Sequence, residues 1–272
     1  MVLSYFSLGI FDAVFRPSTF VQSQVDNYTN NWLGQLIVGS RLSVFYLFNL
    51  VLYAGPLTLS GFGQSTVTIV PGPLLEGFLG LFVADTGAAF DFGVRLLQNS
   101  AYIFVASILV FFTFHLGIIV ARSSTGILQS VHTVTYSVGI YLAAIFTLVW
   151  YLSTAEAIAV ADNWLIAIQK QYIYFFLDIL EVGVDLPTGR PDPVDLGQLT
   201  PQGQFALAGL FLSVFYFLYT LYLGARINHD ATRLESLIAV GTVSVAPALY
   251  VIGSIALVVF IDIQQIVTAI LA

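Results

Sequence analysis

Cysteine is absent from this 272-residue chain, and charged side chains make up only 8% of it. Without thiols there can be no disulfides, thiolate metal sites or cysteine nucleophiles. The scarcity of charge comes with 58% hydrophobic residues and a mean hydropathy of +0.92. This composition excludes a soluble globular domain of ordinary make-up, so the chain is predicted to be an integral membrane protein.

Basic residues are also few. Eight lysines and arginines stand against fifteen aspartates and glutamates, and Lys170 is the single lysine. Nucleic-acid binding needs clustered basic side chains that replace counterions, so nucleic acid is excluded as a partner. Acidic polar segments with little lysine are typical of proteins from salt-saturated environments, where ions screen self-repulsion. The composition therefore predicts a halophilic, archaeal source.

Long stretches without any charge define the fold class. Each is long enough to cross a hydrocarbon core about 30 Å thick, which needs about 20 apolar helical residues. Lipid offers no partner for backbone polar groups, so these stretches must be helices. We predict an all-α, polytopic membrane helix bundle that forms one integral membrane domain over residues 1–272. Its five predicted transmembrane helices cover residues 36–59, 101–121, 133–152, 205–225 and 237–261.

The connections at 60–100 and 153–204 are too long to be simple loops. Acidic residues within 73–97 make a full crossing costly, so an interfacial or re-entrant helix is expected there. A second surface helix is expected over 156–182, and a third, amphipathic one over 1–15. In 156–182 the apolar residues spaced for one helical face are Trp164, Ile168, Tyr172, Phe175 and Ile179. Pro247 is expected to kink the last span.

Arginine positions predict the orientation. In a five-span layout, the arginines near short connections share one side, which the positive-inside rule assigns to the cytoplasm. They are Arg16, Arg41, Arg122, Arg226 and Arg233. Most acidic residues fall on the other side. We therefore predict a multi-pass protein of the cell (plasma) membrane, with its N-terminus inside and its C-terminus outside.

Catalytic motifs are missing from the sequence. There is no phosphate-binding loop, dinucleotide fingerprint, zinc-protease motif or G-x-S-x-G elbow, so no enzyme, cofactor or metal is predicted. His115 is the one histidine inside a predicted span, and His132 lies near the same inner interface. The two could form an intramembrane polar site that binds a metal weakly, or they could bond to hydroxyls and carbonyls. Asn49, Thr113, Ser137 and Ser244 could line a polar path, although such residues usually join helices.

Three segments resemble the Yip family, five-span membrane proteins named for interacting with Ypt/Rab-type GTPases. They are Phe-Arg-Pro-Ser-Thr-Phe at 15–20, Phe-His-Leu at 114–116 with Val-Thr-Tyr-Ser at 134–137, and Tyr-Thr-Leu-Tyr-Leu-Gly-Ala-Arg-Ile-Asn-His at 219–229, which Thr-Arg-Leu-Glu-Ser-Leu-Ile-Ala follows at 232–239. The resemblance implies the same five-span, N-inside and C-outside layout. The chain departs from the family at Val138 and Gly139, where a proline is common, and it lacks the eukaryotic cytosolic domain. The resemblance therefore implies architecture, while GTPase binding is not carried over.

Three functions remain open from the sequence. The first is a non-enzymatic scaffold, assembly factor or membrane-organising protein of the Yip type, which would contact the lipid bilayer and either other membrane proteins or copies of itself. The second is a small-solute transporter or channel subunit, which would need a polar cavity near the midplane. The third is an accessory subunit of a larger membrane complex. If partners bind inside, the candidate surface is formed by Arg122, Arg226, His229 and Arg233.

Overall fold

A computed structural model gives the arrangement of the chain. It describes residues 15–18, 32–59, 72–154, 158–181, 183, 189–190 and 201–260. Within these ranges the regular structure is helical throughout, which confirms the all-α fold class. Most of the predicted surface helix at 1–15 lies outside the described residues.

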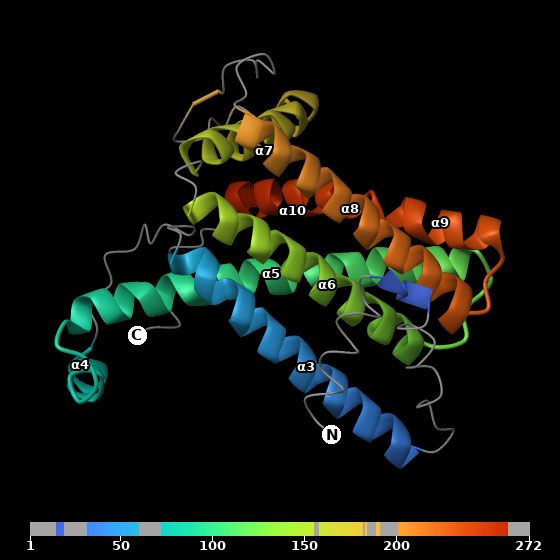
Figure 1. The fold of residues 1–272 in the computed structure, drawn as a ribbon, viewed down its shortest axis with the longest axis horizontal. Coiled ribbons are helices and arrows are strands. Elements are labelled where there is room, and N and C mark those ends of the chain that lie inside the picture. The colour runs from blue at the N-terminus through green and yellow to red at the C-terminus, as the bar shows by residue number, and fades with distance from the viewer. Residues whose placement is uncertain are drawn as a thin grey trace.

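The bundle is built from α3 (Trp32–Leu59), α5 (Thr86–Val120), α6 (Ile127–Thr154), α8 (Pro201–Asn228), α9 (Arg233–Val243) and α10 (Ala246–Phe260) (Figure 1). Four helical segments of the described chain are long and apolar enough to cross a membrane: Trp32–Gly55, Thr86–Val120, Gly203–Asn228 and Arg233–Ala256. The predicted span at 133–152 lies within α6, which is not among these four. The multi-pass character is therefore supported, and the count of five spans stays a prediction.

Large apolar side chains on the outside of the bundle fit a lipid environment. Ile37 is 69% exposed, Phe112 61%, Leu212 70% and Phe215 68%. Exposed apolar area of this extent is unusual for a soluble monomer and marks contact with a membrane or another protein. The outer faces of α3, α5 and α8 thus have the character expected of helices in a bilayer.

The segment at 73–97 differs from the expected separate surface helix. Only α4 (Pro73–Leu79) stands apart, and the residues from Thr86 onward are the first turns of α5 (Figure 1). The Asp85 side chain caps α5 by accepting the Ala88 N–H at 2.9 Å, and Asp91 pairs with Arg95 at 2.7 Å. A helix of 35 residues is about 52 Å long, more than the bilayer core, so these acid-bearing turns can extend beyond it.

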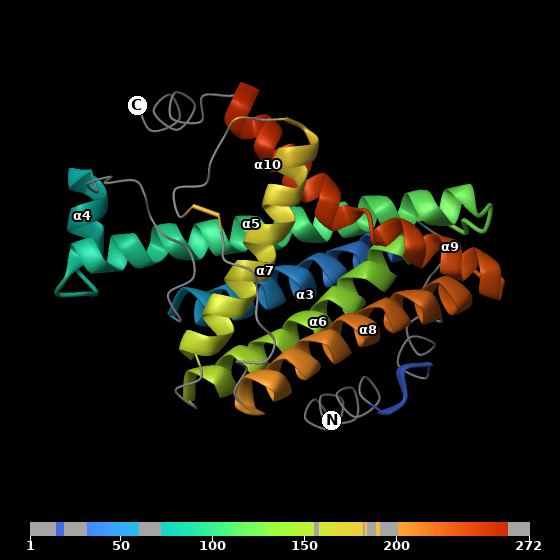
Figure 2. The ribbon, with the colours of Figure 1, turned by 90° about the horizontal axis from the view of Figure 1, so that it is seen from above.

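The helix expected over 156–182 is present as α7 (Ile158–Ile179). It lies across the bundle, steeply inclined to α5, and packs against α8 and α10 (Figure 2). Tyr174 and Leu177 are each 4% exposed, whereas Phe175 and Ile179 are 56% and 60% exposed. One face of α7 is therefore packed against the protein, and the predicted apolar face is turned away from it.

Two glycines bring helices into close contact. A Cβ added at Gly117 on α5 would meet Thr242 Oγ1 at 2.2 Å and Ala239 Cα at 2.7 Å on α9. A Cβ added at Gly224 on α8 would meet Thr133 Cγ2 on α6 at 2.1 Å. Small residues let membrane helices approach in this way. Around these crossings lies the main buried core, which includes the fully buried Phe114, Ile118 and Leu221.

The last span is interrupted, as the position of Pro247 led us to expect. Between α9 and α10, the Ser244 N–H donates to Gly241 O at 3.2 Å and the Val245 N–H donates to Thr242 O at 3.1 Å. These hydrogen bonds reach the carbonyl three residues earlier and replace the regular α-helical bonds to the carbonyl four residues earlier. They occur just before Pro247, which has no N–H to donate. Figure 2 shows α9 and α10 as two successive helices along the bundle.

Candidate functional site

Two short turns meet at one end of the bundle. The α5–α6 connection and the α8–α9 connection lie side by side at the right of Figure 1. The Thr125 hydroxyl in the first turn donates to the Asn228 carbonyl beside the second, at 2.9 Å. By the predicted orientation this end faces the cytoplasm, and we call it the inner end.

Local capping fixes the path of both turns. Arg122 ends α5 in the left-handed conformation, φ 60°, and Ser123 N–H donates back to Ile118 O at 3.1 Å. This backbone pattern is a Schellman-type helix end. On the other turn, Thr232 and Glu235 form a capping box that starts α9. The side chains held between the turns are therefore carried on well-defined backbone.

His229 is buried between the turns, at the centre of a group of polar side chains. It is 2% exposed, and both of its ring nitrogens have partners. Thr125 N–H donates to Nδ1 at 3.4 Å, and Thr125 Oγ1 lies 3.1 Å from the same atom. Nε2 lies 3.1 Å from the hydroxyl of Ser130, and that hydroxyl lies 2.8 Å from Nδ1 of His115 on α5. We call His115, Thr125, Ser130 and His229 the histidine cluster.

The hydrogen-bond donors around His229 determine which tautomer its neutral ring adopts. Because the Thr125 N–H points at Nδ1, that nitrogen accepts, and the ring proton is placed on Nε2. Nε2–H can then donate to Ser130 Oγ, which in turn donates to His115 Nδ1. Aromatic rings pack on both histidines, with Phe114 beside His229 and Phe111 stacked on His115 at 5.8 Å. The cluster therefore ties α5, the start of α6 and the α8–α9 turn together.

Burial, and to a smaller extent the electrostatic influence of His115, lowers the pKa of His229 from 6.5 to about 4. Because the folded-state pKa lies below the unfolded one, stability is complete above pH 6.5 and falls as the pH drops toward 4. Full protonation of His229 in the folded protein would cost about 3 kcal/mol.

We therefore expect the free energy of unfolding to decrease between pH 6.5 and 4 more steeply for the wild type than for His229→Gln. His115 is the titratable group that faces His229, and Thr125, Ser130 and Phe114 make its other contacts. Thermal unfolding in detergent at each pH, followed by circular dichroism, measures the difference. Equal slopes for the two proteins would contradict the assignment.

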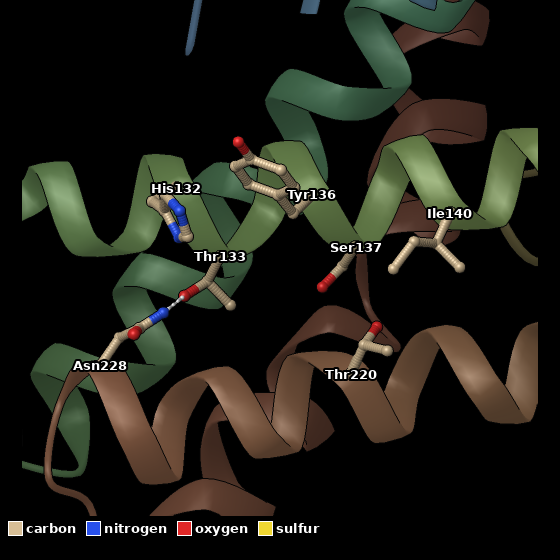
Figure 3. A pocket seen from close by; sticks show the side chains of 7 residues that line it. All are labelled: His132, Thr133, Tyr136, Ser137, Ile140, Thr220 and Asn228. Carbon is tan, nitrogen blue, oxygen red and sulfur yellow. Dashed lines mark hydrogen bonds between the residues drawn. The ribbon is translucent and has the colours of Figure 1, made fainter. Parts of the chain in front are cut away.

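The two histidines predicted as an intramembrane polar site have different neighbours. His115 bonds to Ser130, whereas the His132 ring lies 4.6 Å from the Tyr136 ring (Figure 3). Among the described residues, no three His, Cys, Asp or Glu side chains form a group that could hold a metal. What the sequence did not reveal is that His115 is linked through Ser130 to His229.

The predicted inner-face partner surface is only partly exposed. Arg122, Arg226 and Arg233 are exposed at the inner end, but His229 is buried behind them. His229 can be buried because both of its ring nitrogens have hydroxyl or backbone amide partners inside the protein. The arginines alone form the accessible part, and we call them the inner arginines.

The fold and this site together define an all-helical protein with the features of a multi-pass membrane protein. No protein-family model, curated protein or solved structure matches the chain. The resemblance of the short segments to the Yip family therefore stays a prediction from the sequence.

Proposed function

We propose that this protein is a non-enzymatic membrane scaffold or assembly factor, similar in layout to the Yip family. In this proposal five helices cross the plasma membrane, with α6 as the third span, and the N-terminus lies inside. Its role is to hold partner membrane proteins, or copies of itself, through the inner end.

The observation that carries this proposal is that polar side chains of the helices form hydrogen bonds within their own helix or to a neighbouring helix. Asn49 donates to Phe45 O at 2.7 Å, and Thr113 donates to Leu109 O at 2.8 Å, so each bonds to its own helix. Thr242 bonds across to Thr113 O at 2.9 Å and joins α9 to α5. Such bonds hold a bundle together and leave few polar groups for a solute. A bundle stabilised in this way suits a structural role.

The inner arginines are the proposed partner surface. Arg122 lies in the α5–α6 turn, and Arg226 and Arg233 lie on the helices either side of the α8–α9 turn. The histidine cluster and the capping box hold both turns in place, so the fold sets the positions of the three arginines. Arginine is enriched in protein interfaces because its planar guanidinium group can bind a carboxylate through two hydrogen bonds. An acidic surface on a membrane or peripheral protein is the matching chemistry.

Changing the inner arginines together is expected to release the partner. We expect the triple variant Arg122→Ala, Arg226→Ala, Arg233→Ala to lose the proteins that co-purify with the wild type. The measurement is extraction into nanodiscs followed by quantitative mass spectrometry. The control is the triple lysine variant, which keeps the inner positive charge and hence the predicted topology. Protease protection on both variants shows whether either has inverted.

The outcomes separate the functions. A stoichiometric partner that is lost only in the alanine variant supports a scaffold. A partner bound independently of the inner arginines would instead favour an accessory subunit that packs laterally in a complex. A protein that carries no partner in any form would overturn the proposal.

Transport of a small solute is the second candidate, and the interrupted last span favours it. Transporters often bind substrate where a membrane helix is discontinuous. The break at Ser244 and Val245 is such a place. If one small solute co-purifies with the wild type and is lost in Ser244→Val, transport becomes the favoured function in place of the scaffold.

A further inference from the structure

The connectivity places the start of α7 at the end of the bundle opposite the inner end, which we call the outer end. α6 begins after the inner turn and ends at Thr154, and α7 begins at Ile158. α8 begins at Pro201 and returns to the inner end, where the Asn228 carbonyl accepts from Thr125. The axis of α7 lies across the long axis of α5 instead of along it (Figure 2). With α5 as a membrane span, α7 therefore lies close to the membrane plane on the outer side.

The charges of α7 also argue against a helix that crosses the bilayer. Asp162, Lys170 and Asp178 are spread along its length, and each would be costly in the hydrocarbon core. Among the described helices, α7 is not one of those long and apolar enough to cross. Its apolar residues therefore need an explanation other than a transmembrane position.

Two opposite sides of α7 have different surroundings. One side is exposed and apolar, and its residues stand at helical spacing: Ile168, Tyr172, Phe175 and Ile179. The opposite side lies about 200° around the helix, at positions two residues further along the chain. It holds Tyr174 and Leu177, which are buried against the protein. The exposed apolar side therefore faces directly away from the bundle.

A polar edge separates these two sides. Gln171 and Asp178 are exposed, and each precedes a residue of the apolar side by one position, about 100° around the helix. Arg190 lies at this edge, where its Nη1 donates to Asp178 Oδ2 at 3.2 Å. The same guanidinium lies 4.8 Å from the centre of the Tyr174 ring. The edge thus carries a paired positive and negative charge, which suits the headgroup region of a bilayer and not its hydrocarbon core.

We propose that the apolar side of α7 is a lipid-binding surface that lies in the outer leaflet, with the polar edge at the level of the headgroups. Interfacial helices bury an apolar side about 5–10 Å into the boundary between headgroups and acyl chains in this way. The neighbouring helices support lipid as the occupant, because α7 packs against α8 and α10, which expose Leu212 and Leu249. The choice of leaflet rests on the orientation in the proposed function, whereas the contact with lipid does not.

Site-directed spin labelling tests the depth of this surface, and the absence of cysteine allows single-cysteine variants of the full chain. We would label Ile168→Cys, Phe175→Cys and Ile179→Cys in lipid bilayers and measure collisions with oxygen and with a water-soluble nickel complex. We expect several-fold more oxygen than nickel collisions at all three positions, and one common depth. Gln171→Cys, on the polar edge, should show the reverse preference.

Two positions on α8 calibrate the depth. Phe205 and Phe215 are exposed and lie about 15 Å apart along a helix proposed to cross the membrane, a separation close to that between Ile168 and Ile179 on α7. Labels at Phe205→Cys and Phe215→Cys should therefore differ in depth. A similar difference between Ile168 and Ile179 would mean that α7 crosses the bilayer and would overturn the proposal.

The other contrary outcomes are equally distinct. Nickel collisions at Phe175 as frequent as at Gln171 would place the apolar side in water. Few collisions with either reagent would show that protein, such as a second copy, covers this side. Either result would overturn the proposal.

The leaflet is tested separately by adding a membrane-impermeant maleimide to intact cells that carry Gln171→Cys. We expect modification from outside. Modification only after the membrane is opened would place α7 in the inner leaflet and overturn the orientation of the proposed function, while the depth measurement would still report whether α7 contacts lipid.

Discussion

Replacing Gly117 with alanine is expected to lower the unfolding temperature of the detergent-solubilised protein by several degrees. The new Cβ would lie 2.7 Å from Ala239 Cα and 3.0 Å from Ala239 O, which are backbone atoms of α9. Backbone cannot swing away as the end of a side chain can, so α5 and α9 would have to separate. Overpacking of this kind costs about 1–3 kcal/mol. Differential scanning fluorimetry or circular dichroism in one detergent measures the change.

The same substitution at Gly93 is the control. Gly93 lies on the same helix, and a Cβ there meets nothing within 4 Å. Alanine favours helix over glycine by about 1 kcal/mol, so Gly93→Ala should leave stability unchanged or raise it. If the two variants unfold at the same temperature, α5 and α9 are not in close contact at Gly117.

The course of the helices was largely predictable, because uncharged runs of membrane length leave the backbone no alternative in lipid. The start of α5 was not. Asp85 and Asp91 argued against a continuous span, yet one caps the helix and the other pairs with Arg95 four residues on. A carboxylate satisfied locally in this way does not end a helix. The acidic residues therefore did not predict that the helix begins at Thr86, because their partners lie on that same helix.

The polar site was harder to predict than the fold. His115 was identified because ionisable residues are rare in spans, but its link to His229 passes through Ser130, a residue type common in any turn. His229 and Thr125 are 104 residues apart in the chain. The spacing of residues along a single sequence does not reveal contacts between such distant positions. The available signal was the shortness of both inner turns, which forces their residues to share one end of the bundle.

His229→Leu is expected to be the most destabilising change at the inner end. Leucine is of similar size but offers no polar atom, so the buried Ser130 hydroxyl and the exposed Thr125 N–H both lose the imidazole as a partner. A buried group left without a partner costs about 1–3 kcal/mol, and we expect a loss of that size. Arg226→Leu is the neighbouring control. It changes an exposed side chain and should shift stability by no more than about 0.5 kcal/mol.

A double-mutant cycle with Ser130→Ala distinguishes the bond from a general effect of the leucine. Ser130 is fully buried, and its hydroxyl lies between His229 and His115. If the histidine cluster acts as one unit, the double variant should be less destabilised than the two single variants added together, because the second change removes a group already without a partner. Additive losses would mean that Ser130 and His229 stabilise the inner end independently. The wild-type dependence on pH below 6.5 should also become weaker in His229→Leu, since one of the titrating groups is gone.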